Sequence, residues 1–191
     1  MLSQPISATF TTGEGQPITI ETGKLARQAD GAVTVRQGNC IILATVVANK
    51  EPREGQEFFP LSVDYQEKFA SAGRIPGSFF KREARLNDYE VLTSRLIDRA
   101  LRPLFPDDYF CDVQVLVTLV SSDPEIMPDS LAGLAASSAL AVSDIPIQEM
   151  ISEVRVAKVN GRFVVNPTRT ELETASLEFL IAATEKNLLM V

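Results

Sequence analysis

Residues 73–102 read GRIPGSFFKREARLNDYEVLTSRLIDRALR, and they combine a basic patch, a pair of aromatic residues and a helical pattern. Seven Lys and Arg residues stand against four Asp and Glu residues here, a net of +3, whereas the 191-residue chain carries −7. The rest of the chain therefore sums to −10. A local positive patch on an acidic chain indicates an anionic partner bound at one place. A solvated charged surface is the commoner explanation of such a cluster.

The aromatic pair is Phe79 and Phe80, which follow Pro-Gly-Ser at residues 76–78 and precede Lys81 and Arg82. Pro and Gly favour a loop, and two large apolar rings on a polar loop need a partner if they stay outside the core. Bases of single-stranded nucleic acid stack on such rings while neighbouring cations hold phosphates. The alternative is that both rings fold back into the core.

A helix is expected after this loop. Asn87 or Asp88 can serve as its N-cap, Glu90 lies in the first turn and Pro103 ends it. At about 100° per residue one broad apolar face is predicted. Its members are Leu92, Leu96, Ile97, Ala100 and Leu101.

Arg95, Arg99 and Arg102 follow one another at i, i+4 and i+7 along one edge of the expected helix. Like charges at this spacing repel each other, and a bound phosphate would offset the repulsion because guanidinium groups match phosphate oxygens bidentately. Spacing alone slightly favours a surface stripe that Asp98 partly neutralises.

Four motifs are similar to the bacterial polynucleotide phosphorylase family. They are VDYQEKF at residues 63–69, AGRIPGSFFKRE at 72–83, LTSRLIDR at 92–99 and RPLFP at 102–106. The likeness continues through VQVLVTLVS, the PDSLA helix start and VVNPT to LEFLIAATEKNLLMV, so it covers nearly the whole chain. Residues 84–88 and Ala100 depart from the usual pattern without changing its charges.

The resemblance implies an α+β fold, a ribonuclease PH-like core of the ribosomal protein S5 domain 2 type with a mixed sheet and helices. It implies one domain over residues 1–191, the first of two such cores, truncated near its C-terminal end. The family's second core, KH domain and S1 domain are expected to be absent. The family degrades RNA by processive 3′→5′ phosphorolysis to nucleoside diphosphates, runs in reverse as a polymerase, and acts in mRNA turnover.

The resemblance also assigns roles to residues. It implies an RNA-binding loop of Phe79, Phe80, Lys81 and Arg82, and accessory active-site arginines Arg95, Arg99 and, less directly, Arg102. Catalytic and metal-ligating residues are expected in the second core, with Mg²⁺ there and inorganic phosphate as co-substrate. The implied partners are single-stranded RNA and two further copies in a homotrimer, with no need for DNA or a membrane.

Two other interpretations stay open. One is a non-catalytic, RNA-binding ring subunit of an exosome-like assembly, and the other is an acidic interaction domain whose arginine stripe is merely solvated. For the isolated chain, no catalytic activity is expected.

The amino-acid composition limits the kinds of catalysis and metal binding that the chain can support. The chain has no histidine, which excludes histidine-based catalysis and metal binding within it. Cys40 and Cys111 show no CxxC pattern and predict buried free thiols. No apolar window reaches the length of a membrane span and no leader is evident, so a soluble cytoplasmic protein is expected. Asp123, Glu125 and Asp129 could hold a metal, but turn chemistry and capping explain them more simply.

Alternation and turn signals predict the remaining elements. Strands are expected at residues 18–21, 32–36, 40–48, 58–65, 113–120, 153–159, 162–165, 177–183 and 188–191, with a second helix at 131–143 capped by Asp129 or Ser130. The nearly continuous β-branched run at 113–120 predicts a strand buried on both faces. Asn160-Gly161 is the strongest hairpin signal.

Overall fold

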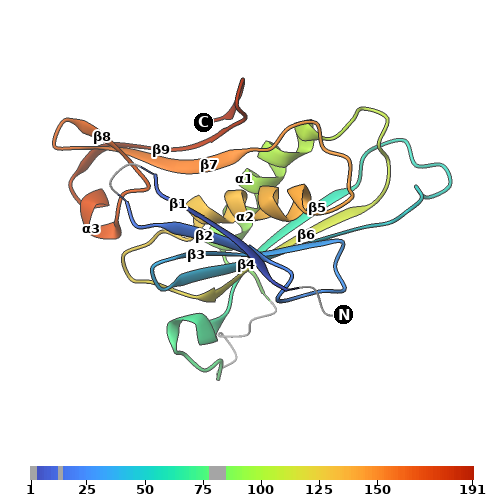
Figure 1. Cartoon of the computed structure of the whole chain (residues 1–191). Helices are drawn as coiled ribbons and strands as arrows, with labels where there is room; N and C mark the ends of the chain where they lie inside the picture. The colour runs from blue at the N-terminus through green and yellow to red at the C-terminus, as the bar shows by residue number, and fades with distance from the viewer. Residues whose placement is uncertain (1–3, 13–14, 78–84) are drawn as a thin grey trace.

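The computed structural model describes residues 4–12, 15–77 and 85–191. Helices α1 and α2 lie between a six-stranded and a four-stranded sheet, which gives the layers seen in Figure 1. The expected α+β arrangement is confirmed, with a mixed sheet in the first layer.

The larger sheet has the strand order β1-β2-β3-β4-β6-β5. Its strands are β1 Ile6–Phe10, β2 Ile18–Thr22, β3 Gly31–Gln37, β4 Cys40–Ala48, β5 Leu61–Glu67 and β6 Val113–Ser121. Neighbours pair antiparallel except β5 and β6, which are parallel and joined through α1. The strands β3, β4 and β6 turn alternate apolar side chains toward the helices, and these residues form the main core.

The smaller sheet has the order β10-β9-β7-β8. Its strands are β7 Ser152–Val159, β8 Arg162–Val165, β9 Ala175–Ala183 and β10 Leu188–Met190. Asn160 and Gly161 connect β7 to β8 with φ angles of 50° and 80°, the left-handed values that a two-residue hairpin turn of this type requires. Its outer face carries exposed apolar residues, of which Phe163 is 66% exposed.

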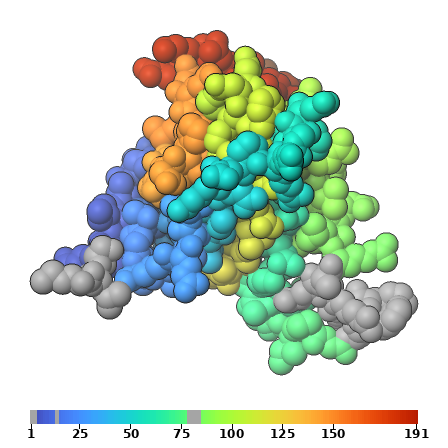
Figure 2. All heavy atoms as spheres, turned by 90° about the vertical axis from the view of Figure 1, so that its right-hand side faces the viewer, coloured from blue at the N-terminus to red at the C-terminus, as the bar shows by residue number. Residues whose placement is uncertain are grey.

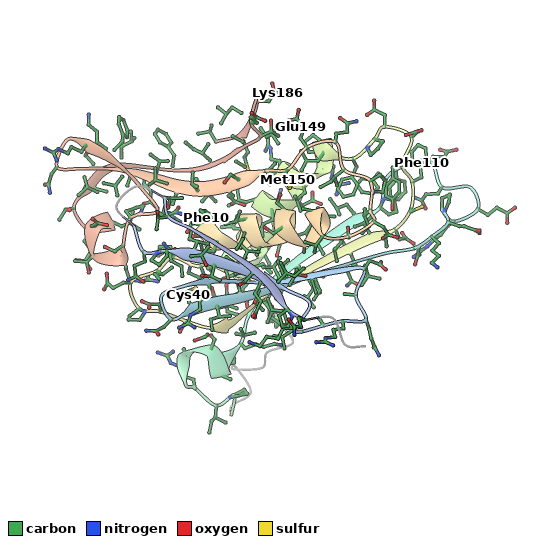
Figure 3. The ribbon with its side chains drawn as sticks, in the orientation of Figure 1. Phe10, Cys40, Phe110, Glu149, Met150 and Lys186 are labelled. Carbon is green, nitrogen blue, oxygen red and sulfur yellow. The ribbon has the colours of Figure 1, made fainter. Side chains whose placement is uncertain are left out.

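The helices are α1 Asp88–Leu101, α2 Asp129–Ala141 and the short α3 Arg169–Leu172, with 3-10 turns η1 Phe69–Ala72 and η2 Arg102–Leu104. The helix α2 is buried on nearly every side because it packs against β3, β4 and β6 on one flank and β7 on the other. Its Ala, Ser and Gly residues permit this close approach of two sheets. Figure 3 shows Lys186 beside Glu149, an ion pair of 3.8 Å that joins the β9–β10 turn to the segment before β7.

The structure corrects four predictions. The strand β1 was not expected, and β5 begins at Leu61 instead of residue 58. The strand β6 is central but buried on one face only, since its other face lies on the open side of the sheet. The helix α2 begins at Asp129 after Pro128, and no side chain caps it.

Both cysteines are buried free thiols, as predicted. In the part of the chain that the structure describes, no helix has the length and apolar character needed to cross a membrane.

Candidate functional site

The four residues of the expected RNA-binding loop, Phe79, Phe80, Lys81 and Arg82, lie outside the described residues. The segment that leads to them is described. The turn η1 and residues 73–77 project from the body of the molecule at the bottom of Figure 2, in green, far from the C-terminal strands. Arg74 is exposed there and Ile75 is 88% exposed, so this projection presents a cation and an apolar side chain to solvent.

The three arginines of α1 differ in their surroundings. Arg95 and Arg99 are exposed on the outward face of the helix, and the side chain of neither makes a hydrogen bond or an ion pair within the described residues. Arg102 pairs with Asp98 at 2.6 Å and donates to the Phe59 carbonyl at 3.1 Å. Arg95 and Arg99 are thus solvent-exposed cations on the same face of α1, whereas the guanidinium group of Arg102 already contacts other residues of the fold.

The buried face of α1 differs from the predicted one. Leu92 is 58% exposed, not buried, and Val91 is exposed beside it. The buried residues of α1 include three polar ones, Glu90, Thr93 and Ser94. The apolar residues buried with them are Ile97, Ala100 and Leu101. Two apolar side chains therefore share the open face of the helix with Arg95 and Arg99.

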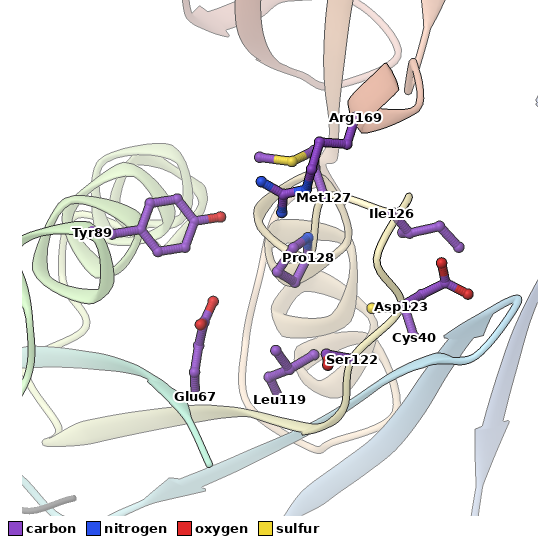
Figure 4. Close-up of a pocket in the computed structure, with 10 residues that line it drawn as sticks. All are labelled: Cys40, Glu67, Tyr89, Leu119, Ser122, Asp123, Ile126, Met127, Pro128 and Arg169. Atoms are coloured by element: carbon purple, nitrogen blue, oxygen red, sulfur yellow. The ribbon is translucent and has the colours of Figure 1, made fainter. Parts of the chain in front are cut away.

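A cavity of about 300 Å³ opens where β5, α1, the β6–α2 loop and α3 meet. Figure 4 shows the Glu67 carboxylate, the Tyr89 hydroxyl and the Arg169 guanidinium pointing into it in front of Pro128. Arg169 Nε donates to the Pro124 carbonyl at 3.1 Å, which holds α3 against the loop. Sequence reasoning missed this cavity because its walls come from five segments that are distant in the sequence, Cys40 of β4 included. The available signal was Glu67, the acidic residue that ends the strand of the VDYQEKF motif.

Burial dominates the electrostatics of the cavity. Burial raises the pKa of Glu67. The 2.9 Å hydrogen bond that the Tyr65 hydroxyl donates to this carboxyl lowers the pKa, while the charges of Glu90 and Asp129 raise it. Burial also raises the pKa of the Cys40 thiol to about 12, with Asp123 adding to the effect. The thiol is therefore protonated at neutral pH and is a poor nucleophile.

Behind the cavity, α2 meets the smaller sheet through charged groups. Arg155 on β7 forms ion pairs with Asp129 on α2 and Glu178 on β9. Glu153, two residues earlier, is 1% exposed, and both its carboxyl oxygens lack a hydrogen-bond partner within the described residues. A Cβ atom at Gly133 would lie 1.6 Å from one of these oxygens, so the carboxyl packs directly on the helix backbone.

The acidic residues of the β6–α2 loop and of the first position of α2 have separate functions in the fold. Asp123 accepts hydrogen bonds from the Asn39 and Glu125 backbone N–H groups, which confirms turn chemistry for this residue. Glu125 accepts from Thr170, and Asp129 pairs with Arg155. Across residues 4–12, 15–77 and 85–191, no group of three or more Cys, Asp or Glu residues is arranged to hold a metal ion.

Comparison with known proteins gives close matches. The chain is 59% identical over 187 residues to the polyribonucleotide nucleotidyltransferase of Parabacteroides distasonis and 57% identical over 186 residues to that of Cytophaga hutchinsonii. These alignments cover 98% and 97% of this chain. A third relative with this name, from Amoebophilus asiaticus, is 57% identical over all 191 residues. The chain spans about a quarter of the length of these relatives, from 25% to 27%.

Two solved structures share the fold at low sequence identity. Rice Rrp46 matches with a TM-score of 0.71 and 14% identity, over 100% of this chain and 79% of that one. A chain of the Archaeoglobus fulgidus exosome with RNA bound to the active site matches with a TM-score of 0.68 and 14% identity, over 97% of this chain and 75% of that one.

Family models divide the chain where the structure changes layer. The model of the 3′ exoribonuclease family, domain 1, matches residues 14–146, which contain most of the larger sheet and both long helices. The model of domain 2 of this family matches residues 149–191, which form the smaller sheet. The chain therefore belongs to the 3′ exoribonuclease family.

Proposed function

We propose that this chain is the first ribonuclease PH-like core of a phosphorolytic 3′→5′ exoribonuclease, a polyribonucleotide nucleotidyltransferase, and that it binds single-stranded RNA. The identity of 57–59% to relatives of that name, over nearly the whole chain, carries the proposal. Residues 1–191 form one functional unit of the longer protein, and that protein is cytoplasmic, homotrimeric and active in mRNA turnover.

The open face of α1 supports a role beside reacting phosphates. In phosphorolysis an inorganic phosphate oxygen attacks the terminal phosphodiester, the bond to the rest of the chain breaks, and a nucleoside diphosphate leaves. Two anions must meet, so cations are needed where the negative charge concentrates. Arg95 and Arg99 are exposed and uncommitted to partners among the described residues, which suits this task. Arg102 has the weaker claim because Asp98 already pairs with it.

Mg²⁺ and the catalytic carboxylates belong, in this proposal, to the second core of the longer protein. The metal when bound would neutralise charge on the reacting phosphates. The part supplied by this chain is binding and orientation of RNA, through the loop containing Phe79, Phe80, Lys81 and Arg82 and through the α1 arginines.

A second candidate is a non-catalytic RNA-binding subunit of an exosome-like ring. The likeness in fold to rice Rrp46 and to a chain of an archaeal exosome favours it. The two candidates differ in one measurement, since only the first requires the longer protein to release nucleoside diphosphates from RNA and phosphate.

RNA binding by the chain tests the shared part. We expect fluorescent oligo(A) to bind with an affinity that falls with salt, and Arg95→Ala with Arg99→Ala to reduce the slope of log K against log salt by about 1.4 if each contacts one phosphate. Arg162→Ala, which removes an exposed arginine from β8, is the matched control and should leave the slope unchanged. Binding that is independent of salt, or of these two arginines, would contradict the proposal.

Turnover by the longer protein tests the chemical part. Arg99→Ala should lower the rate of nucleoside diphosphate release more than it lowers RNA affinity, because a cation beside the reacting phosphates acts mainly in the transition state. An equal loss in both would show that Arg99 contributes binding alone.

A further inference from the structure

The helix α1 closes the outer edge of the larger sheet with side chains. The Tyr65 N–H of β5 donates to Ser94 Oγ at 2.8 Å, and the Glu67 N–H donates to Glu90 Oε1 at 2.8 Å. Arg102 donates to the Leu61 carbonyl at 3.3 Å near the other end of the strand. Backbone groups that would be free at a sheet edge are thus satisfied by one face of a helix.

Glu90 joins this edge to the start of the helix. Its second carboxylate oxygen accepts from the Asn87 N–H at 2.7 Å, while the Asn87 side chain accepts from the Glu90 N–H at 2.9 Å. This reciprocal pair is a capping box. One buried carboxylate therefore fixes where α1 begins and how far along β5 it lies.

Ser94 fixes the rotation of the helix. Its hydroxyl donates to the Glu90 carbonyl at 2.8 Å and accepts from β5, so it holds a single orientation. Glu90 and Ser94 are four residues apart and face the sheet, which turns Arg95 and Arg99 to the opposite side. With no partners of their own in the described part of the chain, these two guanidinium groups are placed by the docking of the helix.

We infer that Glu90 and Ser94 are positioning residues for Arg95 and Arg99. They fix the register of α1 on β5, and this register sets where the two guanidinium groups meet bound RNA. This inference rests on the proposed function. Hydrogen bonds that backbone N–H groups donate to a buried carboxylate are strong and directional, so they hold the helix register better than apolar packing against the strand would.

The test is a double-mutant cycle in the 191-residue chain. RNA affinity and its salt slope are measured for wild type, Glu90→Gln, Ser94→Ala, the double variant Arg95→Ala/Arg99→Ala, and Glu90→Gln added to that double variant. Glu90→Gln keeps the side-chain volume but replaces one acceptor oxygen by a donor. Ser94→Ala is the milder change and serves if Glu90→Gln does not fold. Thermal melts report the folded state of each variant.

We expect Glu90→Gln and Ser94→Ala to lower the salt slope by about 0.7, the contribution of one phosphate contact to a single strand. In the background that lacks both arginines, Glu90→Gln should produce no further change, because positioning has nothing left to act on. Val35→Ala, in the buried face of β3, is the matched control: it should lower the melting temperature without changing the slope.

The outcomes separate the two claims. If Arg95→Ala/Arg99→Ala weakens RNA binding but Glu90→Gln and Ser94→Ala leave it unchanged, the inference that Glu90 and Ser94 position the arginines is wrong and the proposed function stands. If Glu90→Gln has the same effect with and without the arginines, it acts elsewhere and positioning is again wrong. If the arginine double variant binds as wild type does, both claims fail.

Discussion

Replacing Glu153 by Gln should change how stability depends on pH. The carboxyl is fully buried without a hydrogen-bond partner within the described residues, and burial, followed by the charge of Asp129, raises its pKa from 4.5 to about 8. Arg155 lowers the pKa but does not cancel the effect. At neutral pH the folded chain therefore holds this group mostly protonated, whereas the unfolded chain ionises it.

The sign and size follow from linkage. An acid with a raised pKa in the fold contributes its full stability below about pH 4.5, and this contribution is lost as pH rises to about 8. One tenfold change in proton affinity is worth about 1.4 kcal/mol. Raising the pKa from 4.5 to about 8 corresponds to about 3.5 tenfold changes, so the total loss is about 5 kcal/mol, a large share of the roughly 5–15 kcal/mol typical of a domain.

The assay is urea unfolding of wild type and Glu153→Gln from pH 5 to pH 8. Other titrating groups, Glu67 included, are common to both proteins and cancel in the difference of unfolding free energies. We expect that difference to shift in favour of Glu153→Gln as pH rises, because the amide does not titrate. A difference that stays constant over this range would refute the reasoning and show that Glu153 does not have a raised pKa in the fold.

Four further expectations concern other parts of the molecule. Arg102→Ala should lower unfolding stability by roughly 1–2 kcal/mol, because it removes hydrogen bonds to two carbonyls as well as a partly exposed ion pair, whereas Arg99→Ala should change stability little in the same denaturation experiment. Phe79→Ala with Phe80→Ala should weaken oligonucleotide binding by roughly 1–3 kcal/mol per stacked base without a large fall in melting temperature, and a large fall would identify the rings as core. The isolated chain should release no labelled nucleoside diphosphate from oligo(A), phosphate and Mg²⁺, and sustained turnover would contradict the proposal that the catalytic residues lie in a second core. The apolar outer face of the smaller sheet should cause self-association, visible as concentration-dependent light scattering; a clean monomer would count against it.

Local signals in the sequence predicted much of the fold. Asn160-Gly161 specified a hairpin because few residue pairs accept two left-handed conformations in succession. Asn87 was one of two candidate caps, and the structure selects it through Glu90 three residues later. The strand β1 was missed although ISATF alternates apolar and polar residues, because five exposed residues give a weak signal without a visible partner.

Contacts between α1 and the segment around β5 determine which face of the helix is buried and which arginines stay exposed, and helical periodicity alone does not predict these contacts. Leu92 fits an apolar helix face by periodicity, yet Glu90 and Ser94 face the sheet because the backbone edge of β5 needs hydrogen-bond partners. Arg102 fits the arginine stripe by spacing, but carbonyls some forty residues earlier engage it. The sequence predicts three arginines along one helix as a candidate site. The contacts that distinguish Arg102 from Arg95 and Arg99 come from the Phe59 and Leu61 carbonyls, which the spacing of the arginines does not reveal.

The contact between Gly133 and Glu153 restricts how the sequence can vary. The two positions share one volume, since a methyl group at residue 133 would overlap the carboxyl of residue 153. The same methyl group would lie 2.7 Å from the Cβ atom of residue 153, so shortening the side chain at 153 does not by itself make room for alanine, and a glutamate at 153 demands glycine opposite. Glycine at position 133 is therefore a condition for the close approach of helix α2 and strand β7 at this point, for as long as residue 153 carries a side chain.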